Sequence, residues 1–171
     1  PRAQYKLGSM YHKGKGVTKD YKEAVKWYRL AADQGDGGAQ IILGWMYEEG
    51  LGVTQDYKEA LKWYQLSADQ GDAFAQSMLG GIYLRGQGVT QDYKEALKWI
   101  QLSADQGDSA AQGMLGGMYY EGKGVPQDYE EAVKWYRLAA EQELLLAQGM
   151  LGVMFHRGQG VTQDYKEAVK L

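Results

Sequence analysis

Few side chains in this sequence could support metal binding or catalysis. It contains two histidines, His12 and His156, and no cysteine. Disulfides and thiolate metal sites are therefore excluded. The two histidines occupy the same position in repeat units four steps apart, and stacked helix pairs are spaced by about 10 Å. They therefore cannot share a metal or form a catalytic pair, and we interpret both as solvent-facing side chains.

The recurring glycines and carboxylates also have simpler roles than catalysis. The motif Gly-x-Gly-Val could suggest a phosphate loop, but it lacks a third glycine, a following Lys-Ser or Lys-Thr, and a preceding strand. Its presence in every repeat marks it as a turn. The recurring Asp and Glu residues are predicted helix caps, and Glu48, Glu49 and Glu121 are read as ordinary solvated carboxylates. No nucleophile with a base and an orienting group can be assembled. The sequence predicts a protein that is not an enzyme and needs no cofactor or metal.

Composition narrows the classes of partner. The 171 residues carry a formal net charge of −3 and a pI near 5.4, so no basic surplus is available to hold a nucleic-acid backbone. No apolar run approaches the roughly 18 residues needed to span a bilayer. The sequence begins at Pro1 in mid-pattern and ends at Leu171 inside a predicted helix. We interpret it as a segment of a longer protein, and cytoplasmic, periplasmic and secreted locations all stay open.

A block of about 36 residues repeats along the chain without insertion or deletion. The pair Leu-Gly recurs in register at Leu7, Leu43, Leu79, Leu115 and Leu151. A period of this length indicates supersecondary units that bury their apolar faces against their neighbours. The sequence therefore predicts one elongated all-α solenoid domain, residues 1–171, of about five helix-turn-helix repeats. The units run roughly over 1–35, 36–71, 72–107, 108–143 and 144–171, the last being truncated.

The third unit shows how one repeat is built. Apolar residues in 72–83 are spaced by three and four, which predicts a first helix. Gly86 stops that helix. Asp92 precedes Glu95 by three residues, a capping-box arrangement at the start of a second helix over 93–104. Gly107 ends the second helix, and Asp108 can cap the first helix of the next unit.

Four further columns recur at the repeat period. Glycines in the middle of the first helix cost about 1 kcal/mol each, which indicates a neighbouring helix backbone too close for a side chain. Tryptophans of the second helix are predicted to provide the main contact between neighbouring helices. All seven methionines fall in two columns of the first helix, for which we predict core packing rather than an adaptable binding surface. These columns are Gly44, Gly80, Gly116 and Gly152; Trp27, Trp63, Trp99 and Trp135; Met10, Met46, Met118 and Met154; and Met78, Met114 and Met150.

The recurring residues resemble the Sel-one-like repeat family, which is related to the tetratricopeptide repeats. The family pattern is found in the second unit at Ala39, Leu43-Gly44, Tyr47, Gly50, Gly52-Val53, Asp56, Ala60, Trp63, Ala68 and Gly71. The resemblance covers essentially the whole chain, and the 34-residue period of the tetratricopeptide repeat does not fit. It implies a right-handed superhelical solenoid that acts as an adaptor or scaffold, often in bacterial signalling, envelope or host-interaction systems. Cysteine-rich members carry a disulfide in each repeat, which this chain cannot form.

The end of the fourth unit departs from the pattern. Residues 141–146 read Glu-Gln-Glu-Leu-Leu-Leu where other units read Asp-Gln-Gly-Asp. Either the two helices fuse, or a residue other than glycine makes the turn under strain. The register resumes at Ala147, so we expect the turn. Leu144 to Leu146 are read either as local packing, which we favour, or as an exposed contact patch.

Positions that differ most between the repeats identify a candidate binding surface. In related repeats the first helix lines the concave face. Its most variable positions are spaced by four and three, so they share one helix face and form an inner strip along the stack. The inner strip comprises Tyr5, Ser9, His12, Ile41, Trp45, Glu48, Ser77, Gly81, Leu84, Gly113, Gly117, Tyr120, Gly149, Val153 and His156.

The centre of the inner strip is predicted to be hollow at Gly81, Gly113 and Gly117, between Trp45 and Tyr120. Such a groove suits an extended peptide or a partner helix, although Trp45 could instead pack on the neighbouring first helix. The leading hypothesis is a scaffold that binds a protein or peptide partner. Two alternatives stay open: recognition of a small or cell-wall-type ligand, which some relatives bind, and a structural role by end-to-end self-association through uncapped ends.

Overall fold

The computed structural model describes residues 1–170, with the side chain of Lys170 excepted. The described residues form helices and no strand, which confirms the all-α prediction. Each odd-numbered helix begins a repeat and the following even-numbered helix completes it. The helices are α1 (Arg2–Lys13), α2 (Tyr21–Ala32), α3 (Gly37–Glu49), α4 (Tyr57–Ala68), α5 (Ala73–Arg85), α6 (Tyr93–Asp105), α7 (Ser109–Glu121), α8 (Tyr129–Glu141), α9 (Leu145–Arg157) and α10 (Tyr165–Lys170).

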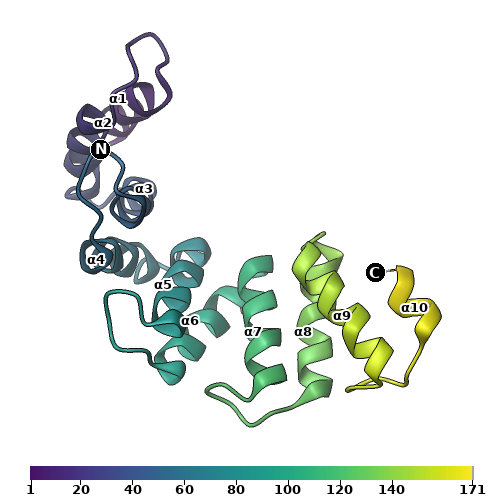
Figure 1. Cartoon of the computed structure of the whole chain (residues 1–171). Helices are drawn as coiled ribbons and strands as arrows, with labels where there is room; N and C mark the ends of the chain where they lie inside the picture. Colours follow the sequence, from purple (N-terminus) through teal and green to yellow (C-terminus); the bar gives the residue numbers. More distant parts are fainter. Residues whose placement is uncertain (171) are drawn as a thin grey trace.

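The helices follow one another along an open arc, with the two ends of the chain at opposite ends of it (Figure 1). Each helix contacts the next helix in the sequence, so the core is continuous from repeat to repeat. Helices α3 and α5 lie on the inner side of the arc, and α4 and α6 on the outer side (Figure 1). Helices α5 and α7 also touch each other directly. The odd-numbered helices therefore supply the inner surface.

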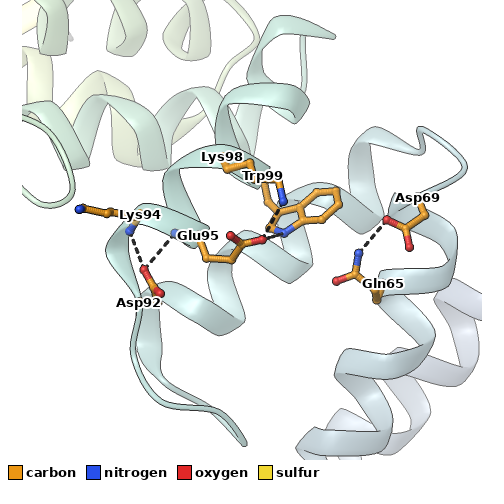
Figure 2. Close-up of polar contacts among 7 residues, drawn as sticks. All are labelled: Gln65, Asp69, Asp92, Lys94, Glu95, Lys98 and Trp99. Atoms are coloured by element: carbon orange, nitrogen blue, oxygen red, sulfur yellow. Dashed lines mark hydrogen bonds and ion pairs between the residues drawn. The ribbon is translucent and has the colours of Figure 1, made fainter.

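Aspartate side chains begin the even-numbered helices. In α6, Oδ1 of Asp92 accepts hydrogen bonds from the amides of Lys94 and Glu95 at 2.9 and 3.0 Å (Figure 2). The reciprocal half of the predicted capping box does not form, because the amide of Asp92 donates to the carbonyl of Tyr83. Instead, Oε1 of Glu95 accepts from Nε1 of Trp99 at 2.9 Å (Figure 2). The aspartate cap is thus confirmed, whereas the glutamate fixes the indole.

The two glycines of each Gly-x-Gly-Val loop have different tasks. Gly86 ends α5 in the left-handed conformation, at φ 68°, as predicted, and its amide donates to the carbonyl of Ile82. Gly88 lies against the preceding repeat, where a Cβ atom would come within 2.5 Å of Cβ of Tyr57. The first glycine therefore stops a helix, and the second allows neighbouring repeats to approach.

The deepest layer of the core is formed by a column of the even-numbered helices next to the tryptophans. Tyr28, Tyr64, Ile100 and Tyr136 are almost fully buried. The tryptophan column is buried only at Trp63 and Trp99, and half-buried at Trp27 and Trp135. The prediction that tryptophan provides the main contact is therefore only partly right, because the adjacent tyrosine column lies deeper.

Glycines in the middle of the odd-numbered helices make room for this column. A Cβ atom at Gly44 would lie 2.7 Å from Cε1 of Tyr64. Among Gly8, Gly44, Gly80 and Gly116, only Gly80 meets helix backbone as well as a side chain, with Cγ1 of Ile100 at 2.5 Å and its amide nitrogen at 3.1 Å from the added Cβ atom. The predicted close approach is correct, but its usual cause is an aromatic ring rather than a helix backbone.

A ladder of glutamines joins successive repeats along one edge of the solenoid. Nε2 of Gln70 donates to Oε1 of Gln40 at 2.7 Å, and Nε2 of Gln40 donates to the carbonyl of Ala32 in the previous repeat at 3.2 Å. The same pair of bonds recurs at Gln106 with Gln76 and at Gln142 with Gln112. Gln40, Gln76 and Gln112 are buried polar side chains, and the ladder gives each a partner.

The turn between α8 and α9 is made without glycine. Glu143 adopts φ 63°, and it is the only residue other than glycine with a positive φ among residues 1–170. The prediction of a strained turn is confirmed. Leu144 occupies the N-cap position of α9 and provides no side-chain cap. Leu145 and Leu146 are 80% and 63% exposed.

Candidate binding groove

An apolar cavity of about 480 Å³ opens on the inner surface between α5, α7 and α9. We call it the central hollow. Its walls come from three odd-numbered helices, its floor includes one residue of α8, and the turn before α9 closes one side. The central hollow is lined by Leu84, Ala110, Gly113, Met114, Gly117, Met118, Glu121, Lys123, Tyr136, Leu144, Leu146 and Met150.

Two glycines of α7 leave the space. Gly113 and Gly117 stand where other repeats carry larger residues such as Ile41 and Trp45. A Cβ atom at Gly113 would lie 2.7 Å from Cδ2 of Leu144, so this leucine folds over the first glycine. A Cβ atom at Gly117 would meet nothing closer than 3.5 Å, so the second glycine leaves room for a ligand.

Methionines form part of the cavity wall. Met114 and Met150 are half-buried and line the central hollow. Both also pack against the buried core, so the prediction of core packing is right for them in part. It is right for Met46, Met118 and Met154, which are buried, and wrong for Met10, which is exposed. A thioether side chain is flexible and polarizable, so these two walls can adapt to the shape of an inserted group.

One hydroxyl group lies on the floor of the central hollow. Tyr136 is 2% exposed, and its hydroxyl oxygen is 3.5 Å from where a Cβ atom of Gly117 would stand. Within residues 1–170, this hydroxyl makes no hydrogen bond. Burial, followed by the charge of Glu121, raises the pKa of Tyr136 to about 12. The phenol therefore keeps its proton and is available as a hydrogen-bond donor.

The charges at the rim neutralise each other. Nζ of Lys123 lies 2.5 Å from Oε2 of Glu121, and both side chains are about half exposed. The central hollow therefore presents apolar walls, one buried hydroxyl and no unpaired charge among its described lining residues.

On α3 and α5, side chains occupy the space above the inner strip. The side chain of Glu48 is 13% exposed; one carboxylate oxygen accepts from the hydroxyl of Tyr64 at 2.9 Å and the other lies 3.9 Å from Nη2 of Arg85. Reading Glu48 as an ordinary solvated carboxylate was therefore wrong. Nη1 of Arg85 would be 3.0 Å from a Cβ atom at Gly81. Gly81 does not line the central hollow as predicted, because this guanidinium lies over it.

Aromatic side chains gather at the N-terminal end of the inner strip. His12 and Trp45 lie with their ring centroids 5.6 Å apart, and His12 also contacts Tyr21. Nδ1 of His12 is buried and has no hydrogen-bond partner within the described chain. Burial, and then the charges of Lys19 and Lys13, lower the pKa of His12. The interpretation of His12 as a solvent-facing residue is only partly right, since the residue is half-buried and its ring lies tilted at 31° against the indole of Trp45.

Comparison with known proteins decides the family. The sequence profile of the Sel1 repeat matches residues 1–36, 38–72, 73–108, 109–144 and 145–171. The chain belongs to the Sel1 repeat family. Sel1 repeat proteins are generally non-enzymatic scaffolds for protein interaction. A search of the curated proteins found no match.

Solved structures of other Sel1 repeat proteins have the same architecture. The chain is 40% identical to c5321, a protective antigen present in uropathogenic Escherichia coli strains, with a TM-score of 0.93 over 99% of this chain. It spans only 38% of that protein. A Sel1 repeat protein from Oxalobacter formigenes is 38% identical, with a TM-score of 0.95, over 99% of this chain and 68% of the other. The agreement confirms the solenoid fold.

The other inner-strip residues of this Sel1 repeat protein lie apart from the central hollow. Tyr5 packs edge-on to Tyr28, Tyr120 bonds to Gln159, and His156 is exposed beside Tyr165. Ser9 and Ile41 are half-buried, Ser77 is buried, and Gly149 and Val153 are exposed. The structure thus gathers Leu84, Gly113 and Gly117 of the inner strip around the central hollow, and Gly149, Val153 and His156 around a second pocket next to α10.

Sequence reasoning missed several lining residues. Met114 and Met150 carried a signal, because they fall on the same helix face as the inner strip. For Leu144 to Leu146 the sequence favours local packing, with an exposed patch as the alternative. Leu144 packs over Gly113, Leu145 and Leu146 are exposed, and no pattern along the chain joins Leu144 and Leu146 to the inner strip. Tyr136 lies on the other helix of its repeat, so no periodic pattern could place its hydroxyl in the cavity.

Two structural searches of the described residues bear on other functions. Residues 1–170 contain no group of three histidine or carboxylate side chains placed to hold a metal ion. None of the helices in that range is both long and apolar enough to cross a lipid bilayer.

Proposed function

We propose that this protein is a non-catalytic scaffold whose inner surface binds a segment of a partner protein, with the central hollow as the main contact. The observation that supports it is the apolar cavity of about 480 Å³, which forms where two glycines of α7 meet leucines that no equivalent position of another repeat carries, Leu84 and Leu144. Residues that only hold a solenoid together recur in each unit, whereas Gly113, Gly117 and Leu146 do not. Concave surfaces with apolar pockets and few charges are typical of peptide-binding grooves.

On α1, α3 and α5, side chains fill the inner strip instead of leaving a cavity. Glu48 and Arg85 pair with each other, and Trp45 stacks on His12. Their exposed edges extend the surface beyond the central hollow, so a partner chain lying along the inner side would reach both regions. We treat the five units as one solenoid domain, because helix contacts run without interruption from α1 to α10.

The test is to fill the cavity without disturbing the fold. Gly117→Leu places a side chain in the central hollow, at a helix position where a Cβ atom has room. Lys94→Leu adds an equally apolar side chain at an exposed position of α6 and serves as the matched control. Both variants should keep the circular dichroism and melting temperature of the parent.

Each variant is used to capture partners from an extract of the source organism. We expect a partner that the parent and Lys94→Leu retain and that Gly117→Leu loses, with the same order of affinity when the purified partner is titrated. Equal retention by all three proteins would place binding elsewhere and contradict the proposed site.

A further inference from the structure

The buried tyrosine of α8 differs from its equivalents in one respect. In the second repeat the hydroxyl of Tyr64 donates to Glu48 at 2.9 Å. In the first repeat the side chain of Ser9 lies beside the phenol of Tyr28. In the fourth repeat the position equivalent to Ser9 is Gly117, so Tyr136 has no partner there.

The unpartnered hydroxyl belongs to the cavity rather than to the core. Only 2% of the surface of Tyr136 is exposed to solvent, and the residue nevertheless lines the central hollow. The atom of Tyr136 nearest to the open side of Gly117 is the hydroxyl oxygen. The hydroxyl is not among the fully buried polar atoms that lack a partner, so it opens into the central hollow. A ligand that fills the hollow must supply an acceptor, because a donor buried without one costs about 1–3 kcal/mol.

We infer that the central hollow binds an extended peptide segment, with an apolar side chain between the methionine walls and a backbone carbonyl that accepts a hydrogen bond from the hydroxyl of Tyr136. This inference rests on the proposed function and selects one of the two binding modes that the groove could serve. The apolar side chain matches Leu84, Met114 and Met150, and the closed ion pair at the rim leaves no charge for the peptide to match.

The hydroxyl group distinguishes an extended peptide from a helix. Carbonyl groups inside an α-helix already accept hydrogen bonds from amides four residues later. The middle of a docked helix therefore presents only its side chains to the floor of the central hollow. An extended segment has free carbonyls on both sides of each side chain. An extended chain therefore offers an apolar anchor and an adjacent free carbonyl along its whole length, whereas a helix offers them together only in its last turn.

The probe is a displayed library of random short peptides, selected on the whole chain and then synthesised singly. Binding is followed in protein labelled with ¹³C at the methionine methyl groups, assigned by single Met→Leu substitutions. We expect the signals of Met114 and Met150 to move, because they line the central hollow. Met46 and Met154 are fully buried outside it and serve as controls within the same molecule.

Removal of the hydroxyl isolates the hydrogen bond. Tyr136→Phe should weaken the selected peptides by about two- to tenfold, the worth of one neutral hydrogen bond, without lowering the melting temperature of the free protein. Tyr64→Phe is the matched control; it should leave peptide affinity unchanged and lower the melting temperature, because Glu48 loses its donor. Gly117→Ser should also weaken the peptides, since it places a side chain beside the phenol of Tyr136 as Ser9 does for Tyr28.

Four results would overturn the inference. Peptides that bind Tyr136→Phe as tightly as the parent, yet lose binding in Gly117→Leu, would show that the groove works without this hydrogen bond. A gain of peptide helicity on binding would replace the extended mode with a docked helix. Movement of the Met114 and Met150 signals by hexanol but by no peptide would assign the cavity to a small amphiphile. A partner captured in a Gly117-dependent way, with no peptide selected, would leave the proposed function standing and this inference wrong.

Discussion

The second and fourth repeats contain equivalent buried tyrosines, Tyr64 and Tyr136, but the two repeats present different inner surfaces. Around Tyr64 the inner strip is closed, because Glu48 accepts its hydroxyl and Trp45 and Arg85 cover the neighbouring space. Around Tyr136 the strip is open, and two glycines expose the hydroxyl to a cavity. The difference teaches that this solenoid can create a binding surface by removing side chains while the packing of successive helices is kept.

Glycine has opposite meanings at two adjacent positions of α7. Gly116 makes room for the core, since its added Cβ atom would lie 2.8 Å from Cδ1 of Tyr136. Gly117 makes room for the groove, since the nearest atom would be at 3.5 Å. The comparison between closed and open repeats can be tested by substitutions that treat the two roles separately.

The largest effect is expected at these two glycines. Gly116→Ala should lower the free energy of unfolding by about 1–2 kcal/mol, because overpacking against a rigid ring outweighs the gain in helix propensity. Gly117→Ala should raise it by about 0.5–1 kcal/mol, because only the propensity gain applies. Thermal and urea unfolding of the two variants measure the opposite signs, and a gain in both would mean that Gly116 is not sterically required.

The second-largest effect is expected when the hydroxyl groups of Tyr64 and Tyr136 are removed. Tyr64→Phe should cost about 1–3 kcal/mol of unfolding free energy, since a largely buried carboxylate loses its donor. Tyr136→Phe should be neutral or slightly stabilising, since no internal hydrogen bond is lost. Urea titrations of both variants check this, and equal losses would contradict the contrast between a closed and an open repeat.

The turns that precede α5 and α9 extend the comparison. Gly71 adopts φ 91° with nothing near it, whereas Glu143 adopts φ 63° beside the central hollow. Glu143→Gly should raise the free energy of unfolding by about 1 kcal/mol, because the left-handed conformation is unfavourable for a residue with a Cβ atom. Gly71→Glu should lower stability by a similar amount. Melting temperatures of the reciprocal pair test the prediction, and unchanged values in both would exclude strain at this turn.

The smallest effect is a pH dependence at the aromatic end of the strip. Burial among Tyr21, Tyr28 and Trp45, with Lys13 and Lys19 nearby, lowers the pKa of His12 in the folded protein. The unfolded chain therefore binds a proton more readily, and stability should fall as the pH drops below the ordinary value of about 6.5 and level off beneath the lowered pKa.

The variant His12→Leu isolates this contribution. Leucine stands at the equivalent position of the third repeat, Leu84. The fall in melting temperature between neutral and mildly acidic pH should be smaller in the variant than in the parent. The same fall in both proteins would assign the pH dependence to other groups.

The sequence predicted the architecture from local patterns. Leu-Gly at a fixed period located the odd-numbered helices, Asp92 and its equivalents marked helix starts, and Gly86 and its equivalents marked helix ends. These features act through residues a few positions apart, so a pattern along the chain contains them. The same logic predicted the turn at Glu143, because the register resumes at Ala147.

The sequence by itself therefore determined the all-α repeat, the places where its helices begin and end, and the columns that vary between repeats. Only the tertiary structure decided which of those residues meet: Arg85 covers Gly81, Leu144 folds over Gly113, and Tyr136 reaches the floor of the cavity from another helix. The physical reason is that helical periodicity reports the direction of a side chain from its own axis. Burial, ion pairing and hydrogen bonding depend on the distance to side chains of other helices, which the packing of successive repeats alone sets.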